Sequence, residues 1–343
     1  MYIKHLWKAS IDENAWQQAK RMTLGATLGW CIASMFDLPY GAFYGVYPLV
    51  LLGFIPTRTN AKITIEFLAS TVFGLMASGF LVAKLSPHPI IMLLCFTFFS
   101  WLCFKCMVQG LFIFGASSVC ILTSIVHLAS YDATSWNSLF YAQITASIIS
   151  VIVSYLAFLL FPDKGKKLPP PSPPHLTRIQ LNHRVWLGTI CCCMQFIVFQ
   201  SLSLSDSFGA QIATILVLMS LRRDMIWISA QKRLLGVFTS CCFVMLIQLI
   251  VNNLSHIWLI TLIFYIIGML IFCTEHAREG IPGKGFPGTT TIAILYGSLT
   301  PMNNQIGESM YRAISITLAV CLMLLCVNMT HYFLNQFKST RWV

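Results

Sequence analysis

The sequence predicts an all-α integral membrane protein of about twelve transmembrane helices, arranged as two parallel six-helix repeats. Its composition, its apolar segments and the placement of its basic residues all indicate this class. Of the 343 residues, 57% are hydrophobic and only 10% are charged, whereas about 25% of the residues in a soluble domain are charged. Because a soluble protein of this composition would have no polar coat, the composition excludes a soluble fold.

Apolar segments recur along the whole chain. A span takes roughly 20 residues, or fewer where neighbouring helices shield it. The first set of expected spans covers about 21–36, 41–55, 63–84, 89–106, 110–128 and 138–161. The second set covers about 184–204, 208–220, 228–251, 257–273, 286–300 and 309–333. The second span of each set is short, and so is the fifth span of the second set.

The basic residues indicate the orientation. Of the 22 Lys and Arg residues, all except Lys84 and Arg312 fall in segments assigned to the cytoplasm. The positive-inside rule therefore predicts that both termini are cytoplasmic. The net charge of +11 is typical of loops that face anionic lipid, and it does not indicate nucleic-acid binding.

The chain divides into two similar halves. We expect an amphipathic cytoplasmic lead-in at 1–20, a first half at 21–162, a cytoplasmic linker rich in Pro and Lys at 163–183, and a second half at 184–343. The halves repeat weakly, since Arg21-Met-Thr-Leu-Gly25 matches Arg184-Val-Trp-Leu-Gly188. Because each half has an even number of spans, the repeats should be parallel. Such duplication is common in transporters and also occurs in channels and assembly scaffolds.

One segment resembles a known family. Residues 230–250, which begin Ala-Gln-Lys-Arg-Leu-Leu-Gly, resemble the cytoplasmic entry of a helix in the fusaric acid resistance superfamily. The order of spans, with a last span of the first half closing at Leu160-Phe161-Pro162, is also similar. The chain is most similar to compact members of unknown function that lack the large cytoplasmic domain of the aromatic acid exporters.

The resemblance implies an efflux component of the bacterial inner membrane that exports small aromatic or weak organic acids. It also implies a periplasmic adaptor (membrane-fusion) protein and an outer-membrane channel as partners. The superfamily is related to plant malate-permeable anion channels. An anion channel, or a scaffold that carries no flux, therefore stays open as an alternative, and so does a homo-oligomer.

Four ionisable residues are candidates for proton coupling. Inserting an ionisable group at the centre of a span costs about 2.5–3.5 kcal/mol of free energy, so such residues usually have a function. Glu66 and Arg233 occupy similar places in the two halves and could meet across the pseudo-axis. Alternatively, Glu66 pairs with Lys62 one turn earlier. Glu275 and His276 could relay protons or could lie at a solvated loop edge.

Candidate substrate-binding residues lie in short segments broken by Gly or Pro, which mark transporter sites. They are Tyr44, Tyr47, Pro48, Gly115, Gly288, Thr289 and Thr290. Free backbone N–H groups at the helix start near Pro287 suit a carboxylate, and Phe112, Phe114 and Phe286 could stack on a ring. Close helix packing through small residues explains the same pattern equally well. Arg312 could attract a departing acid or extend to the lipid headgroups.

Motifs of catalysis are absent from the sequence. It contains no P-loop pattern, no H-E-x-x-H, no G-x-S-x-G and no His and acidic residues at metal spacing. We therefore expect no enzymatic activity, no cofactor and no metal. The absence of an ATP site, together with the resemblance, predicts an exporter driven by the proton gradient.

Overall fold

The structure is a computed structural model that describes residues 12–54, 61–130, 136–164, 176–202, 207–251, 258–280, 283–297 and 305–342. These residues form twelve α-helices and no strand. Eight of the helices are long and apolar enough to cross a membrane. The prediction of an all-helical protein is confirmed, and the eight apolar helices indicate a multi-pass membrane protein.

Each predicted span coincides with one helix. The first six helices are α2 (Glu13–Met35), α3 (Ala42–Phe54), α4 (Ala61–Leu85), α5 (Pro89–Val108), α6 (Phe112–Ala129) and α7 (Trp136–Leu160). The other six are α8 (Arg178–Ser201), α9 (Phe208–Leu218), α10 (Arg223–Val251), α11 (Trp258–Glu279), α12 (Gly285–Gly297) and α13 (Gln305–Leu334).

Four helices begin well before the expected spans, namely α2, α8, α10 and α13. The Thr177 side chain accepts a hydrogen bond from the Gln180 backbone N–H (3.3 Å), and the Gln180 side chain accepts one from the Thr177 N–H (3.1 Å). This capping box starts α8 at Arg178, so residues 178–183 of the expected linker are helical. Similarly, α2 runs without a break from Glu13 through residues expected in the lead-in. Residues 1–11 of the lead-in lie outside the described residues.

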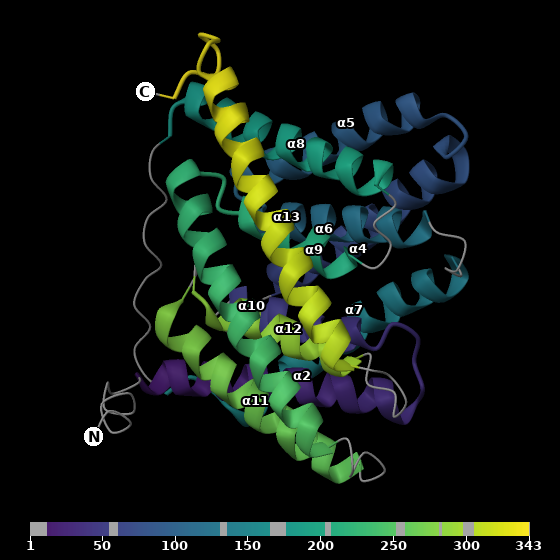
Figure 1. Ribbon diagram of the computed structural model, residues 1–343, viewed down its shortest axis with the longest axis vertical. Helices are drawn as coiled ribbons and strands as arrows, with labels where there is room; N and C mark the ends of the chain where they lie inside the picture. Colours follow the sequence, from purple (N-terminus) through teal and green to yellow (C-terminus); the bar gives the residue numbers. More distant parts are fainter. Residues whose placement is uncertain are drawn as a thin grey trace.

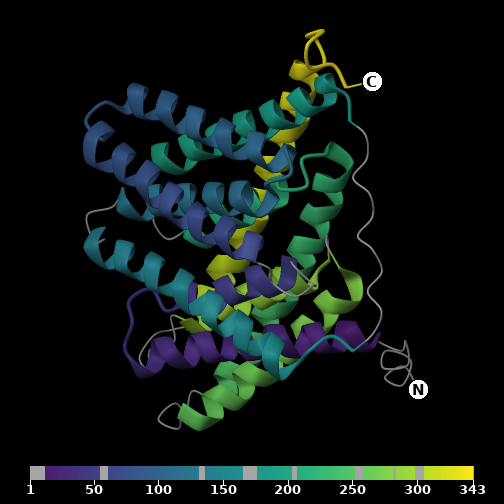
Figure 2. The same ribbon diagram turned by 180° about the vertical axis from the view of Figure 1, so that it is seen from behind.

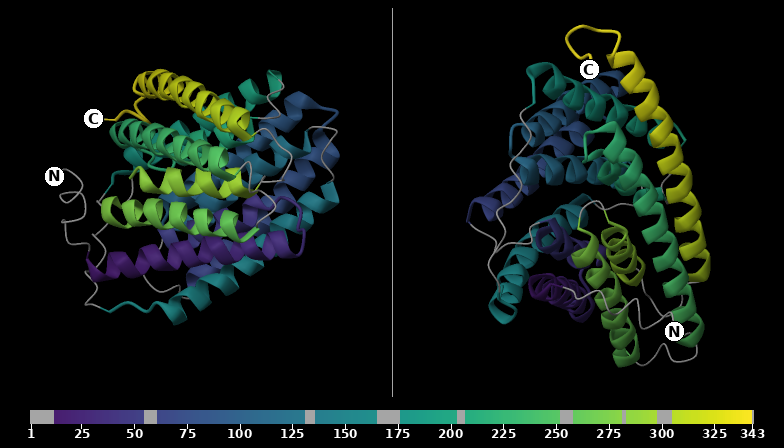
Figure 3. Two further views of the ribbon diagram at one scale, coloured as in Figure 1. Left: turned by 60° about the horizontal axis from the view of Figure 1, so that its bottom comes forward. Right: turned by 90° about the vertical axis from the view of Figure 1, so that its left-hand side faces the viewer.

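The helices pack as a bundle that brings distant parts of the chain together. Helices α10 and α13 lie side by side on one face (Figures 1 and 3), and α4, α5 and α7 cover the opposite face (Figure 2). Between these faces α3 packs on α12, and α6 packs on α9. The start of α2 and the end of α13 lie on the same side of the bundle (Figure 1).

A buried arginine joins the two ends of the first six helices. Arg21 on α2 is only 1% exposed, and its Nη1 donates to Asp163 Oδ1 (2.7 Å) and to the carbonyl of Phe161 (3.0 Å) just after α7. Its guanidinium also lies 4.3 Å from the centroid of the Phe158 ring. The interaction holds the end of α7 against the start of α2.

The residues after α13 contact the start of α8 in a comparable way. His183 on α8 donates from Nδ1 to the carbonyl of Thr340 (2.6 Å), and its Nε2 lies 3.0 Å from His331 Nδ1. The Arg184 guanidinium lies 5.6 Å from the centroid of the Trp342 ring. These contacts fix the last described residues to the first turns of α8.

Replacing Asp163 tests the buried ion pair. We expect Asp163→Asn to lower the free energy of unfolding by about 3–5 kcal/mol, because the change leaves the Arg21 charge buried without its carboxylate. Thermal unfolding in detergent measures the effect. Lys164→Gln is the matched control, since it removes an exposed ion pair to Glu13 that contributes less than about 1 kcal/mol. Equal unfolding temperatures for the two variants would contradict the expectation.

Candidate functional site

A cavity of about 90 Å³ lies among the short helices at the centre of the bundle. This volume is several times the ~10–15 Å³ that one water needs. Helices α3, α6, α9, α10, α12 and α13 form its walls, with Phe67 from α4. The lining is largely aromatic, with hydroxyl groups, a thiol and two arginines, and includes Phe43, Tyr47, Phe54, Phe67, Phe112, Ser117, Cys120, Ser124, Phe208, Gly209, Arg233, Phe286, Thr290, Thr291 and Arg312.

Short helices make room for this cavity. Helices α3, α9 and α12 have 13, 11 and 13 residues, so they are about 16–20 Å long, less than the ~30 Å hydrocarbon core. The start of α3 reaches the end of α12 because Gly297 has no side chain, since a Cβ there would lie 2.6 Å from the Ala42 nitrogen. The end of α3 meets the start of α12, where the rings of Phe54 and Phe286 are 4.8 Å apart. Helices α3 and α12 therefore run antiparallel along one wall.

Aromatic side chains gather at two levels of the cavity. At the start of α3, the Phe43 ring stacks on Tyr47 (5.5 Å) and lies 6.3 Å from Phe208 at the start of α9. At the end of α3, the Phe54 ring contacts Phe286 and lies 6.4 Å from Phe112. The Tyr47 hydroxyl donates to the Gln143 side chain, which fixes its ring. The walls thus offer ring faces and edges to an apolar or aromatic ligand.

Two arginines bring positive charge into this apolar cavity. Arg233 on α10 is 6% exposed, and Arg312 on α13 has a buried Nε with no hydrogen-bond partner among the described residues. Within the described ranges, no carboxylate lies within ion-pair distance of either guanidinium. A buried charge without a partner costs several kcal/mol, and an anion in the cavity would offset this cost. Guanidinium groups also match the geometry of carboxylates.

Four of the twelve candidate residues from the sequence line the cavity, namely Tyr47, Arg233, Thr290 and Arg312. Phe112 and Phe286, which the sequence offered as stacking partners, also line it. Phe114 does not, and its ring packs 5.6 Å from Phe73.

Five further candidates lie behind the cavity wall. The Tyr44 hydroxyl lies 2.6 Å from Thr145 Oγ1, and Thr289 donates to the Phe286 carbonyl (2.8 Å). Pro48 packs against Gly25 on α2, where an added Cβ would lie only 3.2 Å from the Pro48 Cβ. Gly115 lies against the backbone of α5, and Gly288 against the Phe272 ring. These residues support helix packing, which is the alternative that the sequence left open.

The remaining candidates also lie off the cavity. Glu66 Oε1 is 3.8 Å from Lys62 Nζ, and no ion pair joins Glu66 to Arg233 in the part of the chain that the structure describes. His276 is only 1% exposed, so it does not lie at a solvated edge, and its Nε2 lies 3.1 Å from the Gly53 carbonyl at the end of α3. Glu275 belongs to an ionic cluster next to this contact.

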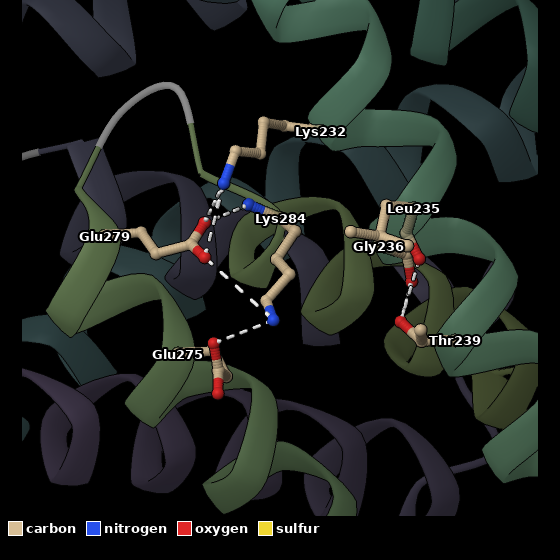
Figure 4. Close-up of polar contacts among 7 residues, drawn as sticks. All are labelled: Lys232, Leu235, Gly236, Thr239, Glu275, Glu279 and Lys284. Carbon is tan, nitrogen blue, oxygen red and sulfur yellow. Dashed lines mark hydrogen bonds and ion pairs between the residues drawn. The ribbon is translucent and has the colours of Figure 1, made fainter. Parts of the chain in front are cut away.

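The ionic cluster consists of Lys232, Glu275, Glu279 and Lys284 (Figure 4). Lys284 Nζ lies 3.3 Å from Glu275, and Lys232 Nζ lies 3.4 Å from Glu279. The Lys284 backbone N–H also donates to Glu279 (2.8 Å). The cluster therefore fastens α10 and α11 to the residues that lead into α12.

Several lining residues were not predicted from the sequence, among them Phe43, Phe54, Phe67 and Phe208. They are single aromatic residues in apolar runs, which carry no signal of their own. Phe208 precedes Gly209, and that break in the apolar run was the one cue for its position. No group of three or more His, Cys, Asp or Glu that could hold a metal ion occurs among the described residues.

Residues 18–157 match the model of a family described as a protein of unknown function (DUF2955). The matched segment runs from α2 to α7. No curated protein and no solved structure matches the chain. The matched segment thus covers most of the first six helices and supplies two of the cavity's walls, α3 and α6.

Gly209 provides a test of the cavity's charge. A Cβ at this position would lie 2.8 Å from Arg312 Cζ and closer still to Nη1, so Gly209→Ala would displace the guanidinium. We expect the affinity for a carboxylate probe such as benzoate to fall about tenfold, or about 1.4 kcal/mol. Isothermal titration of the purified protein measures it.

Gly79→Ala is the matched control, because a Cβ on Gly79 would meet the rings of Trp136 (3.2 Å) and Phe140 (3.9 Å), neither of which lines the cavity. Unfolding temperatures of both variants should stay close to that of the unchanged protein, since each new methyl meets the end of a side chain. An unchanged benzoate affinity in Gly209→Ala would show that Arg312 does not contact the anion.

Proposed function

We propose that the protein is a transporter of the bacterial inner membrane that exports small aromatic or weak organic acids through the central cavity. One observation carries the proposal: Arg233 and Arg312 face a cavity with aromatic walls, and among the described residues no carboxylate neutralises them. The arginines suit the acidic group of such a compound, and the aromatic walls suit its ring.

We propose further that all twelve helices span the membrane as two parallel repeats, 21–162 and 184–343. The helix contacts support this, since pairs in one half recur in the other. The recurring pairs are α2–α7 and α8–α13, α3–α7 and α9–α13, α4–α6 and α10–α12, and α5–α6 and α11–α12. The contacts between halves also correspond, with α3–α12 matching α6–α9 and α2–α11 matching α5–α8. The family match to 18–157 alone is consistent with one six-helix unit.

The orientation follows from the basic residues, which favour cytoplasmic termini. We expect reporter domains fused to the N-terminus and to the C-terminus both to be active in the cytoplasm and inactive in the periplasm. This expectation is supported by the structure, in which the start of α2 and the end of α13 lie on the same side of the bundle (Figure 1). A periplasmic report from either terminus would contradict the proposed arrangement. A fusion at Asp132, between the fifth and sixth predicted spans, should give the opposite result.

An exporter of this kind works with partners. In line with the resemblance in the sequence, we propose a periplasmic adaptor protein and an outer-membrane channel, which would receive the acid at the end of the cavity near Arg312. A homo-oligomer is compatible with this role.

Transport itself is measured with inside-out vesicles that contain only this protein and a labelled small aromatic acid, with and without an imposed proton gradient. The proposal predicts accumulation that requires the gradient. Flux that merely equilibrates the acid would favour an anion channel. Absence of flux for a series of aromatic acids would favour a scaffold and would contradict the proposal.

Glu66 is the proposed proton-coupling carboxylate. It precedes the cavity-lining Phe67 on α4, and its side chain is 12% exposed. We expect Glu66→Gln to abolish gradient-driven accumulation in these vesicles while leaving equilibrating flux, because an amide cannot exchange a proton. Lys62→Gln is the control, since it removes the ion-pair partner and keeps the carboxylate. Unchanged accumulation and pH dependence in Glu66→Gln would refute this role.

A further inference from the structure

The two cavity arginines act on the same part of the cavity. Arg312 on α13 packs on the start of α9, where an added Cβ on Gly209 would lie 2.8 Å from its Cζ. Arg233 comes from the adjacent α10 (Figure 3), and its charge acts on the thiol of Cys120, which lines the cavity from α6. The charge of Arg312 also acts on that of Arg233, so the two guanidinium groups are close enough to repel each other.

The parts of the wall that these arginines contact also lie close together. The Gln211 side chain, two positions after Gly209 on α9, donates to the carbonyl of Thr123, three positions after Cys120 on α6 (3.3 Å). Gly209 and Cys120 are therefore at most about 8 Å apart along the helix axes. The two guanidinium groups thus form a single region of double positive charge.

Hydroxyl groups border this region. Ser117 and Ser124 line the cavity one turn before and one turn after Cys120, and Thr291 lines it from α12. The Ser124 hydroxyl donates to the Cys120 carbonyl (2.5 Å). By contrast, the hydroxyls of Ser117 and Thr291 make no hydrogen bond to another residue in the described ranges. They can therefore donate to the oxygen atoms of an acidic ligand.

The charge of the region sets the charge of the ligand that suits it. No described carboxylate forms an ion pair with Arg233 or Arg312. A ligand with one negative charge would leave one of the two buried positive charges without a counter-ion, which is costly. Two negative charges held close together would neutralise both guanidinium groups and leave the rest of the ligand to the aromatic walls.

Accordingly, we propose that the cavity selects aromatic compounds that carry two negative charges side by side at one end, as adjacent carboxylates do. Arg233 and Arg312 both bind this acidic end, and the ring packs against the aromatic side chains. This inference rests on the proposed function and specifies its substrate class.

Three acids test the inference by isothermal titration of the purified full chain. Phthalate has two adjacent carboxylates, terephthalate has the same charge with its carboxylates on opposite sides of the ring, and benzoate has one carboxylate. We expect phthalate to bind at least about tenfold more tightly than either other acid, about 1.4 kcal/mol. Equal or tighter binding of benzoate would overturn the double charge, and equal or tighter binding of terephthalate would overturn the side-by-side arrangement.

Variants test whether both arginines bind the acidic end. Arg233→Gln and Arg312→Gln should each bind phthalate and benzoate with similar affinity, because one positive charge remains. Arg222→Gln, which changes an exposed arginine paired with Asp224, should keep the preference for phthalate. If either cavity variant keeps the preference, that arginine does not bind the acidic end. The three acids on the unchanged protein still decide the inference if a variant fails to fold.

Vesicle transport separates this inference from the proposed function. Accumulation of benzoate without preference for phthalate would overturn the doubly charged acidic end and leave an exporter of monovalent acids. Absence of binding and transport for all three acids would overturn both.

Discussion

The packing at the centre of the bundle has to accommodate two positive charges in a largely apolar cavity. Arg233 and Arg312 come from α10 and α13, which lie side by side along one face of the bundle. The carboxylates that do form ion pairs serve other purposes, since Asp163 binds Arg21 and the ionic cluster of Lys232, Glu275, Glu279 and Lys284 holds α10, α11 and α12 together. Because no ion pair joins a described carboxylate to Arg233 or Arg312, the described residues leave the positive charge of the cavity without a counter-ion.

Short helices are the second requirement, because a full-length span in their place would fill the cavity. A helix that ends at membrane depth leaves backbone groups that lipid cannot satisfy, so it must be covered by protein. Helices α3 and α12 are covered by each other and by α2, α10 and α11. Trp30 on α2 shows how such an end is satisfied, since its indole N–H donates to the carbonyl of Tyr296 near the end of α12 (3.0 Å).

The helices could be predicted from the sequence, whereas much of the site could not. Long apolar runs fix the positions of α4 to α7 directly, and even short α9 was expected because Gly209 and the Arg222–Arg223 pair bound it. The early start of α8 was missed, because four of the residues 178–183 are polar or charged, which is not typical of a membrane span. The short broken segments contain Tyr47 and Thr290, which line the cavity, but Tyr44 and Thr289 share those segments and do not line it. Only packing decides which side of a short apolar helix meets the cavity, and no periodic pattern marks that side when all sides are buried.

If the protein binds an organic anion, the anion should lie in the cavity that Arg233 and Arg312 line. The most direct measurement is an electron cryo-microscopy structure of the full chain in lipid nanodiscs with iodinated benzoate, whose iodine marks the ring. We expect ligand density among Phe43, Tyr47 and Phe54, with the carboxylate at Arg233 or Arg312. A cavity that holds a lipid chain or water while the iodine lies elsewhere would contradict it.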